Sequence, residues 1–79
     1  MNQINLAEMN GKEIKEIHFD GDSYISMDEL VYENPKAFLQ VEHRNGEMAE
    51  VPMFFVIVAD GGEEKQRYNY LNIQGVVWA

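Results

Sequence analysis

The stretch AFLQVEHRNGEMAEVPMFFVIVADGG, residues 37–62, decides the fold of this chain. Residues 37–44 alternate between a more apolar and a more polar side, which is the period-two pattern of a half-buried strand. Asn45-Gly46 follows and is a strong hairpin signal, because a two-residue type I′ turn requires positive φ at both central positions. The sequence therefore predicts a β-hairpin that turns at Asn45-Gly46.

The second arm of this hairpin contains the most apolar run in the chain, residues 53–59. Pro52 precedes the run, and proline is confined to edges, strand starts and bulges because it has no N–H to donate. A strand that is apolar on both faces is usually covered on both faces. We therefore expect residues 53–59 to be core, with a partner-facing interface strand as the alternative. Asp60-Gly61-Gly62 is expected to form the turn that ends the arm.

The segments before the hairpin favour further β-structure. Residues 12–20 fit either a helix or a strand, and we favour a strand because the turn-forming residues 20–23 join them to another β-like segment. Earlier in the chain, within residues 1–11, Asn5 and Glu8 are suited to cap one helical turn that ends at Gly11, with a short strand as the alternative.

The segment between residues 23 and 34 has two interpretations. Ser26-x-x-Glu29 matches a capping box, and Asn34-Pro35 would stop a helix, which predicts one short helix over about residues 26–33 with Leu30 and Val31 facing the sheet. The alternative is a longer strand over residues 23–32.

After the hairpin, residues 67–73 alternate and are expected to form a strand with Tyr68 and Tyr70 on one side. Gln74-Gly75 indicates a bulge or bend, and the apolar residues 76–78 are expected to be tied into the sheet. The expected fold is α+β and mostly β, a single domain over residues 1–79. It would consist of a four- to five-stranded antiparallel meander with the one short helix.

The composition of the chain limits the classes of partner that it is expected to bind. The chain has 79 residues, no cysteine, and fourteen acidic against six basic residues, which gives a net charge of −8. Such a chain is repelled by nucleic acid and by anionic lipid and is attracted to basic surfaces. Without a signal peptide, a membrane-spanning run or any cysteine, it is expected to be cytoplasmic.

No motif for catalysis stands out, and we expect a protein that is not an enzyme and has no catalytic, cofactor-binding or metal-binding residues. The best local group of titratable side chains is His18 with Glu16 and Asp20, which is a weak signal for a general base or a metal ligand. A small-ligand or metal-dependent enzyme built on these residues is the least favoured hypothesis.

Two surfaces are candidates for binding a protein partner. One is acidic, and the other is aromatic, with Tyr24, Tyr32 or Trp78 as further members; tyrosine and tryptophan suit interfaces because they bury large areas and keep a polar tip. The predicted partner-binding residues are Glu13, Glu16, Asp20, Asp22, Asp28, Glu29, Glu33, Tyr68 and Tyr70.

The leading hypothesis is a small inhibitor that docks by protein–protein contact on a basic, nucleic-acid-handling protein. By analogy of size and charge alone, small acidic cysteine-free domains of this kind are common among phage-encoded inhibitors of host defence, including anti-CRISPR and DNA-mimic proteins. The alternative is a structural or assembly module that forms a homodimer through the apolar strand and the C-terminus.

Overall fold

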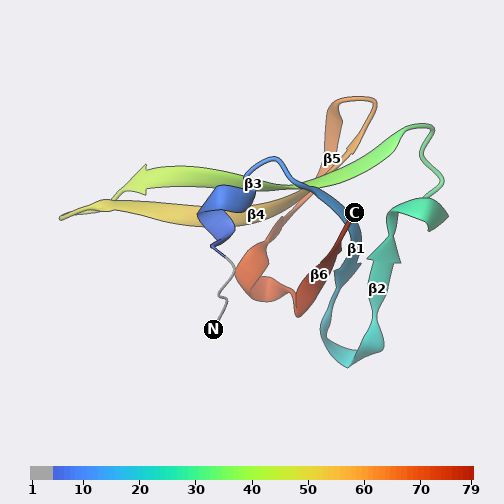
Figure 1. Cartoon of the computed structure of the whole chain (residues 1–79), viewed down its shortest axis with the longest axis horizontal. Helices are drawn as coiled ribbons and strands as arrows, with labels where there is room; N and C mark the ends of the chain where they lie inside the picture. The colour runs from blue at the N-terminus through green and yellow to red at the C-terminus, as the bar shows by residue number, and fades with distance from the viewer. Residues whose placement is uncertain (1–4) are drawn as a thin grey trace.

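The computed structural model describes residues 5–79, which form six antiparallel strands joined by tight turns (Figure 1). The strands are β1 (Glu13–His18), β2 (Tyr24–Ser26), β3 (Pro35–Asn45), β4 (Glu50–Asp60), β5 (Glu63–Asn69) and β6 (Gly75–Trp78). Short 3-10 turns are η1 (Leu6–Met9), η2 (Asp20–Asp22), η3 (Met27–Glu29) and η4 (Tyr70–Asn72). The predicted small, mostly β, antiparallel fold is confirmed.

Strand β1 joins two parts of the sheet. The strand order is β2-β1-β3-β4-β5, and β6 also pairs with β1. Ile17 pairs with β2 and with β6, while Ile14 pairs with β3 and with β6. Because a strand has two edges, β6 fills one edge of β1, and β2 and β3 share the other. The expected meander describes β3, β4 and β5, and the C-terminal strand is tied into the sheet by returning to β1.

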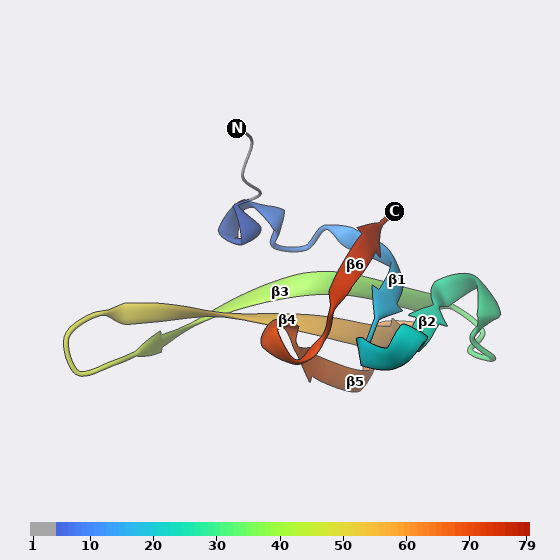
Figure 2. The ribbon, with the colours of Figure 1, turned by 90° about the horizontal axis from the view of Figure 1, so that it is seen from below.

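The hydrophobic core lies where β1 and β6 cross over the long β3–β4 pair (Figure 2). Partly buried side chains from the turns and from β5 and β6 pack around its centre, which places one core in the part of the chain that is described. The buried residues at the centre are Ile14, Ile17, Met27, Ala37, Leu39, Val56 and Val58.

The β3–β4 hairpin forms, but its turn differs from the prediction. Asn45 is the last residue of β3 and pairs with Glu50, so the loop is residues 46–49, with the Gly46 N–H donating to the Ala49 carbonyl at 2.9 Å. Neither Asn45 nor Gly46 has the positive φ that a type I′ turn needs. The observed register pairs Leu39 with Val56, whereas a turn centred on Asn45-Gly46 would place Leu39 opposite Pro52. The observed register pairs the apolar residues 55–59 with residues 36–40 of β3, and this long-range pairing overrides the local turn signal.

A bulge in β1 explains why the sequence of residues 12–20 fits both a helix and a strand. Ile14 and Ile17 are both buried although three residues separate them, which is a helix-like spacing. The pairing of β1 with β6 shifts by one residue between Ile14 and Glu16, which makes Lys15 the extra residue. The segment is a strand, as predicted, and the bulge turns both isoleucines toward the core.

The predicted helix over residues 26–33 is wrong. Only η3 is helical there, and Ser26 is a buried residue of β2 that makes no side-chain cap. Ser26 pairs with Glu16 of β1, so the strand pairing outweighs the capping-box pattern. The alternative strand over residues 23–32 is also too long, because β2 ends at Ser26. At the N-terminal end, η1 matches the capped turn, with Asn5 Oδ1 accepting from the Ala7 N–H at 3.0 Å, and residues 1–4 of that segment lie outside the described residues.

Residues 55–59 of β4 are buried on both faces, as the sequence predicts, whereas Met53 and Phe54 of the predicted core run are only partly buried. Val56 and Val58 face the core, and Phe55, Ile57 and Ala59 on the opposite face are each at most 8% exposed. No second layer of strands covers this outer face within residues 5–79. Side chains from the neighbouring strands cover it instead, because the Arg67 guanidinium of β5 lies over the Phe55 ring and bonds to Glu42 of β3.

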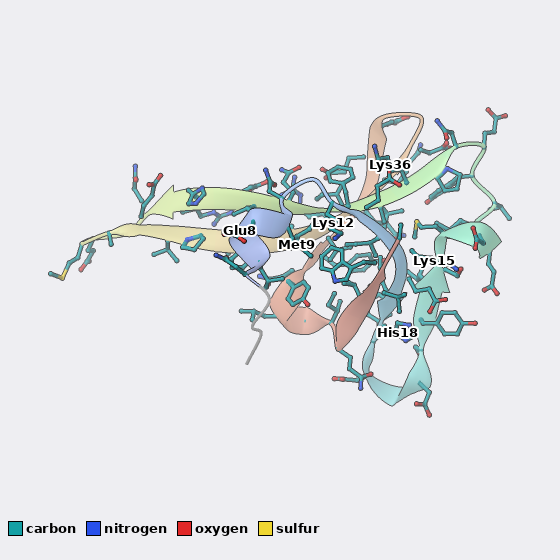
Figure 3. The ribbon with its side chains drawn as sticks, viewed as in Figure 1. Glu8, Met9, Lys12, Lys15, His18 and Lys36 are labelled. Carbon is teal, nitrogen blue, oxygen red and sulfur yellow. The ribbon has the colours of Figure 1, made fainter. Side chains whose placement is uncertain are left out.

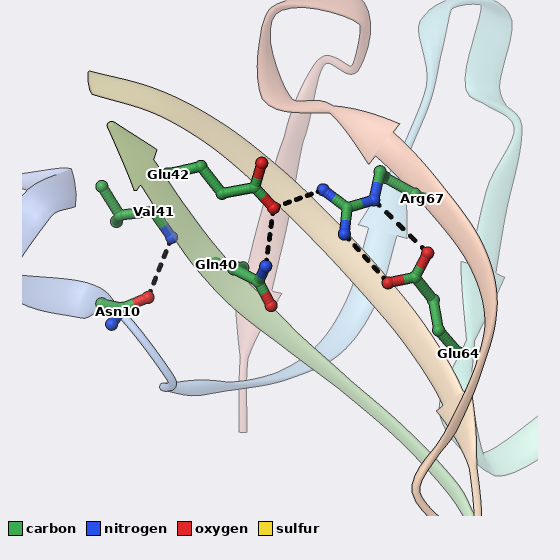
Figure 4. Close-up of polar contacts among 6 residues, drawn as sticks. All are labelled: Asn10, Gln40, Val41, Glu42, Glu64 and Arg67. Atoms are coloured by element: carbon green, nitrogen blue, oxygen red, sulfur yellow. Dashed lines mark hydrogen bonds and ion pairs between the residues drawn. The ribbon is translucent and has the colours of Figure 1, made fainter. Parts of the chain in front are cut away.

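Arg67 is the centre of this side-chain cover (Figure 4). Its guanidinium lies 5.0 Å from the centre of the Phe55 ring, a cation–π distance. It donates to a Glu42 oxygen at 2.6 Å and to the Glu64 carboxylate at 3.0 and 3.3 Å. Gln40 donates to the same Glu42 oxygen at 2.7 Å, and these contacts hold the pKa of Glu42 below its usual range, with the Arg67 hydrogen bond as the largest cause. Charged groups thus fix one another above an apolar surface.

If the outer face is a packed core, Ile57→Ala should cost about as much stability as Leu39→Ala on the inner face, about 2–4 kcal/mol in each case. Ile57→Val should cost about 0.5–1.5 kcal/mol and remains measurable if the alanine variants do not fold. Urea unfolding measures these losses, and Val31→Ala, at a 97% exposed position, is the control with a loss under about 0.5 kcal/mol. An Ile57→Ala loss close to the Val31→Ala value would contradict burial of the outer face.

Arg67→Met should keep an aliphatic cover over Phe55 while removing both ion pairs. The pKa of Glu42 then rises toward its ordinary value, about 4.3. A carboxyl with a lowered pKa in the folded state adds stability above its unfolded pKa, and this stability is lost as the pH falls through the folded pKa. The advantage of the wild type over the variant should therefore be largest near neutral pH and shrink below about pH 4.

Carboxyl NMR titration of Glu42 and urea unfolding between pH 3 and 7 measure this effect. Lys65→Met, which removes only the 3.3 Å pair with Glu63, is the matched control and should leave the Glu42 titration unchanged. An Arg67→Met variant in which Glu42 titrates as in the wild type would refute the role assigned to Arg67.

Candidate partner-binding surface

The predicted acidic residues lie on one end of the molecule, around β1, β2 and the segment that leads into β3. Glu13 and Glu16 are on β1, Asp20 and Asp22 are in η2, Asp28 and Glu29 are in η3, and Glu33 is in the following loop. All are exposed except Glu16, which is half-buried. Within residues 5–79, only two of these carboxylates have ion-pair partners: Glu13 lies 3.4 Å from the Lys36 Nζ, and Glu16 lies 2.8 Å from the His18 Nε2. We call this set the acidic surface.

His18 and Glu16 are brought together, but Asp20 is not. The His18 ring also stacks on Tyr24, with ring centres 5.4 Å apart and planes 16° from parallel. Asp20 makes no hydrogen bond or ion pair with His18 or Glu16 in the part of the chain that the structure describes. The same part contains no group of three or more histidine and acidic side chains placed to hold a metal ion.

A hollow of about 410 Å³ opens within the acidic surface, between β1, η3 and the start of β3. It exists because β2 pairs with residues 16–18 of β1 and β3 pairs with residues 13–14 on the same edge, which leaves a gap beside Lys15. Lys15 and Lys36, labelled in Figure 3, both line it. The lining residues include apolar Ile14, Met27, Pro35 and Ala37 and acidic Glu13 and Asp28. The hollow thus combines an apolar floor with a charged rim.

Tyr68 and Tyr70 do not share one exposed strand face in the structure. β5 ends at Asn69, whose Oδ1 accepts from the Leu71 N–H at 3.0 Å and caps η4, so Tyr70 lies in the turn and not on a strand. Both tyrosines pack against the core. The Tyr68 ring meets Phe19 edge-on at 5.3 Å, its hydroxyl donates to Gln66, and burial raises its pKa. The expected strand over residues 67–73 therefore ends early.

Two exposed apolar side chains, Tyr24 and Val31, lie on the acidic surface outside the predicted set of partner-binding residues. Tyr24, half exposed, lies beside Glu16 through its contact with His18. Val31 is 97% exposed, although the sequence placed it toward the sheet; Leu30 and Tyr32 on either side of it pack against the core instead. An extended segment alternates its side chains, so the alternation of residues 30–32 was the signal that could have identified Val31 as exposed.

Comparisons of this chain with known protein families, with curated proteins and with solved structures found no match. A search of residues 5–79 for a helix with the length and apolarity needed to span a bilayer found none.

Tyrosine substitutions should separate the packed aromatics from the exposed one. Tyr68→Ala should cost about 2–4 kcal/mol of unfolding free energy because its ring packs against the core. Tyr24→Ala, at 50% exposure, should cost under about 1 kcal/mol. Urea unfolding of both variants is the measurement, with Tyr68→Phe as a control that keeps the ring. Equal losses at the two positions would show that Tyr68 is not part of the core.

Proposed function

We propose that this protein is a non-enzymatic inhibitor whose acidic surface docks on a basic, nucleic-acid-handling protein. The observation that supports the proposal is the hollow within the acidic surface, which gives that surface a concave, partly apolar centre. Its charged lining is mixed, because Lys15 and Lys36 line it together with Glu13 and Asp28, and the surrounding unpaired carboxylates supply the negative charge. Buried apolar anchors surrounded by polar residues supply most of the energy in protein interfaces. A basic partner that carries an apolar side chain next to its positive charges would fit both features.

Charge favours this class of partner. Asp20, Asp22, Asp28, Glu29 and Glu33 have no ion-pair partner within the described residues, so their charge is uncompensated locally. Such a surface steers a positively charged partner by long-range attraction and speeds the encounter. The net charge of −8 disfavours direct binding to nucleic acid or to an anionic membrane.

The mechanism we propose is competition for the nucleic-acid site of the partner, by charge and by steric exclusion. This corresponds to the anti-CRISPR-like and DNA-mimic types among phage anti-defence proteins, and the correspondence rests on size and charge. The proposal places the protein in the cytoplasm, where a chain without cysteine needs no disulfide for stability.

The test is capture of a partner on immobilised protein from nuclease-treated lysate of a candidate host, elution by a salt gradient and identification by mass spectrometry. Asp28→Lys with Glu29→Lys alters the rim of the hollow. Glu47→Lys with Glu50→Lys makes the same change in net charge at the exposed tip of the β3–β4 hairpin and is the matched control.

The expected result is a basic nucleic-acid-handling protein that elutes at moderate salt, because contacts between exposed charges are screened. The control variant should retain it, the Asp28/Glu29 variant should lose it, and duplex nucleic acid should displace it. Equal loss from both double variants would indicate a response to net charge alone, and retention that is independent of salt would contradict the proposal.

A further inference from the structure

A second hollow, of about 290 Å³, lies at the base of the projecting part of the β3–β4 hairpin, beside η4. Its lining residues are Val51, Pro52, Met53, Phe54, Asn69 and Leu71. None of these side chains is charged, whereas the hollow within the acidic surface and another beside Lys36 and Glu64 both have charged walls. This hollow is therefore suited to an apolar occupant.

The hollow has an apolar projection at its own rim. Leu71 is 87% exposed and Val51 is 51% exposed, and both line the hollow. The Asn69 cap at 3.0 Å holds the Leu71 backbone in η4, so the leucine is presented from a fixed position. A projection next to a cavity on one surface is self-complementary, because a two-fold axis places each leucine over the other molecule's cavity.

The adjoining edge of β4 is free as well. Pairing with β5 begins at Phe55, so residues 50–54 of β4 have no strand on that edge within residues 5–79. Pro52 has no N–H, which prevents this edge from extending as a regular ladder. A contact here must depend on side-chain packing more than on strand addition.

We propose that this surface, Val51, Pro52, Met53, Phe54 and Leu71, is the contact between two copies of the chain in a symmetric dimer. Two molecules of charge −8 repel one another, so self-contact is favoured where carboxylates are absent. The chain from residue 65 to residue 79 has no acidic residue. The sequence-based dimer hypothesis placed the contact on residues 53–59 and the C-terminus. Phe55–Ala59 are buried within one molecule and β6 is paired with β1, which moves the proposed contact to the start of β4 and to η4.

The test is the mass of the purified full chain by sedimentation equilibrium over a range of concentrations, at low salt and at 1 M salt. The wild type should form a dimer that 1 M salt leaves intact or strengthens, because salt screens the repulsion and does not weaken apolar contacts. Leu71→Glu should raise the dimer dissociation constant by at least about tenfold, since it places a charge in the centre of the contact.

Three controls make the result specific. Val31→Glu introduces the same charge at an exposed position on the acidic surface and should leave the dimer intact. Leu71→Met should retain it, and circular dichroism should show that every variant is folded. Asp28→Lys with Glu29→Lys should also dimerise, so failure of the acidic surface and failure of this contact are distinguishable. A chain that stays monomeric at all concentrations and salts, or a dimer unaffected by Leu71→Glu, overturns the proposal.

Discussion

Burial of both faces of residues 55–59 in β4 is the constraint on which the rest of this structure depends. A chain of this length has only enough strands to place one layer, β1, β2 and β6, over the inner face. The outer face is closed by the stems of charged side chains, with Arg67 fixed between Glu42 and Glu64 above Phe55. Polar contacts at the surface therefore serve a packing role, since they hold long side chains over apolar atoms.

This use of cations shapes the electrostatics of the whole molecule. Arg67, Lys36 and Lys65 contact carboxylates, and Lys12 lies 5.9 Å from the centre of the Trp78 ring. Four of the six basic residues thus make local contacts around the sheet. Five carboxylates without an ion-pair partner in residues 5–79 lie in η2, η3 and the loop before β3, which concentrates unpaired negative charge at that end. The other unpaired carboxylates of the described residues, Glu8, Glu47, Glu50 and Asp60, are spread over η1, the loop before β4 and the two ends of β4.

The strands were predictable from the sequence because their patterns are local, as in the apolar run of β4 and the alternation in β3. The details that failed depend on pairing between distant segments. Asn45-Gly46 does not form a type I′ turn because Leu39 pairs with Val56 instead of Pro52. Ser26 does not cap a helix because it pairs with Glu16 on β1. The end of β5 was missed for a different reason: Asn69 is a local cap whose signal the tyrosine alternation concealed.

The candidate site also has one part that the sequence could predict and one part that it could not. The acidic residues could be identified by composition, but the hollow at their centre arises where β2 and β3 share one edge of β1, which no local pattern encodes. The acidic surface around β2 and η3 lies toward one end of the molecule, and η4, beside the uncharged surface, lies near the middle of its long axis (Figure 1). A dimer formed through the uncharged surface would leave both acidic surfaces free. Such a dimer would be bivalent, and a partner with two basic sites at a matching distance would bind it more tightly than a single surface allows.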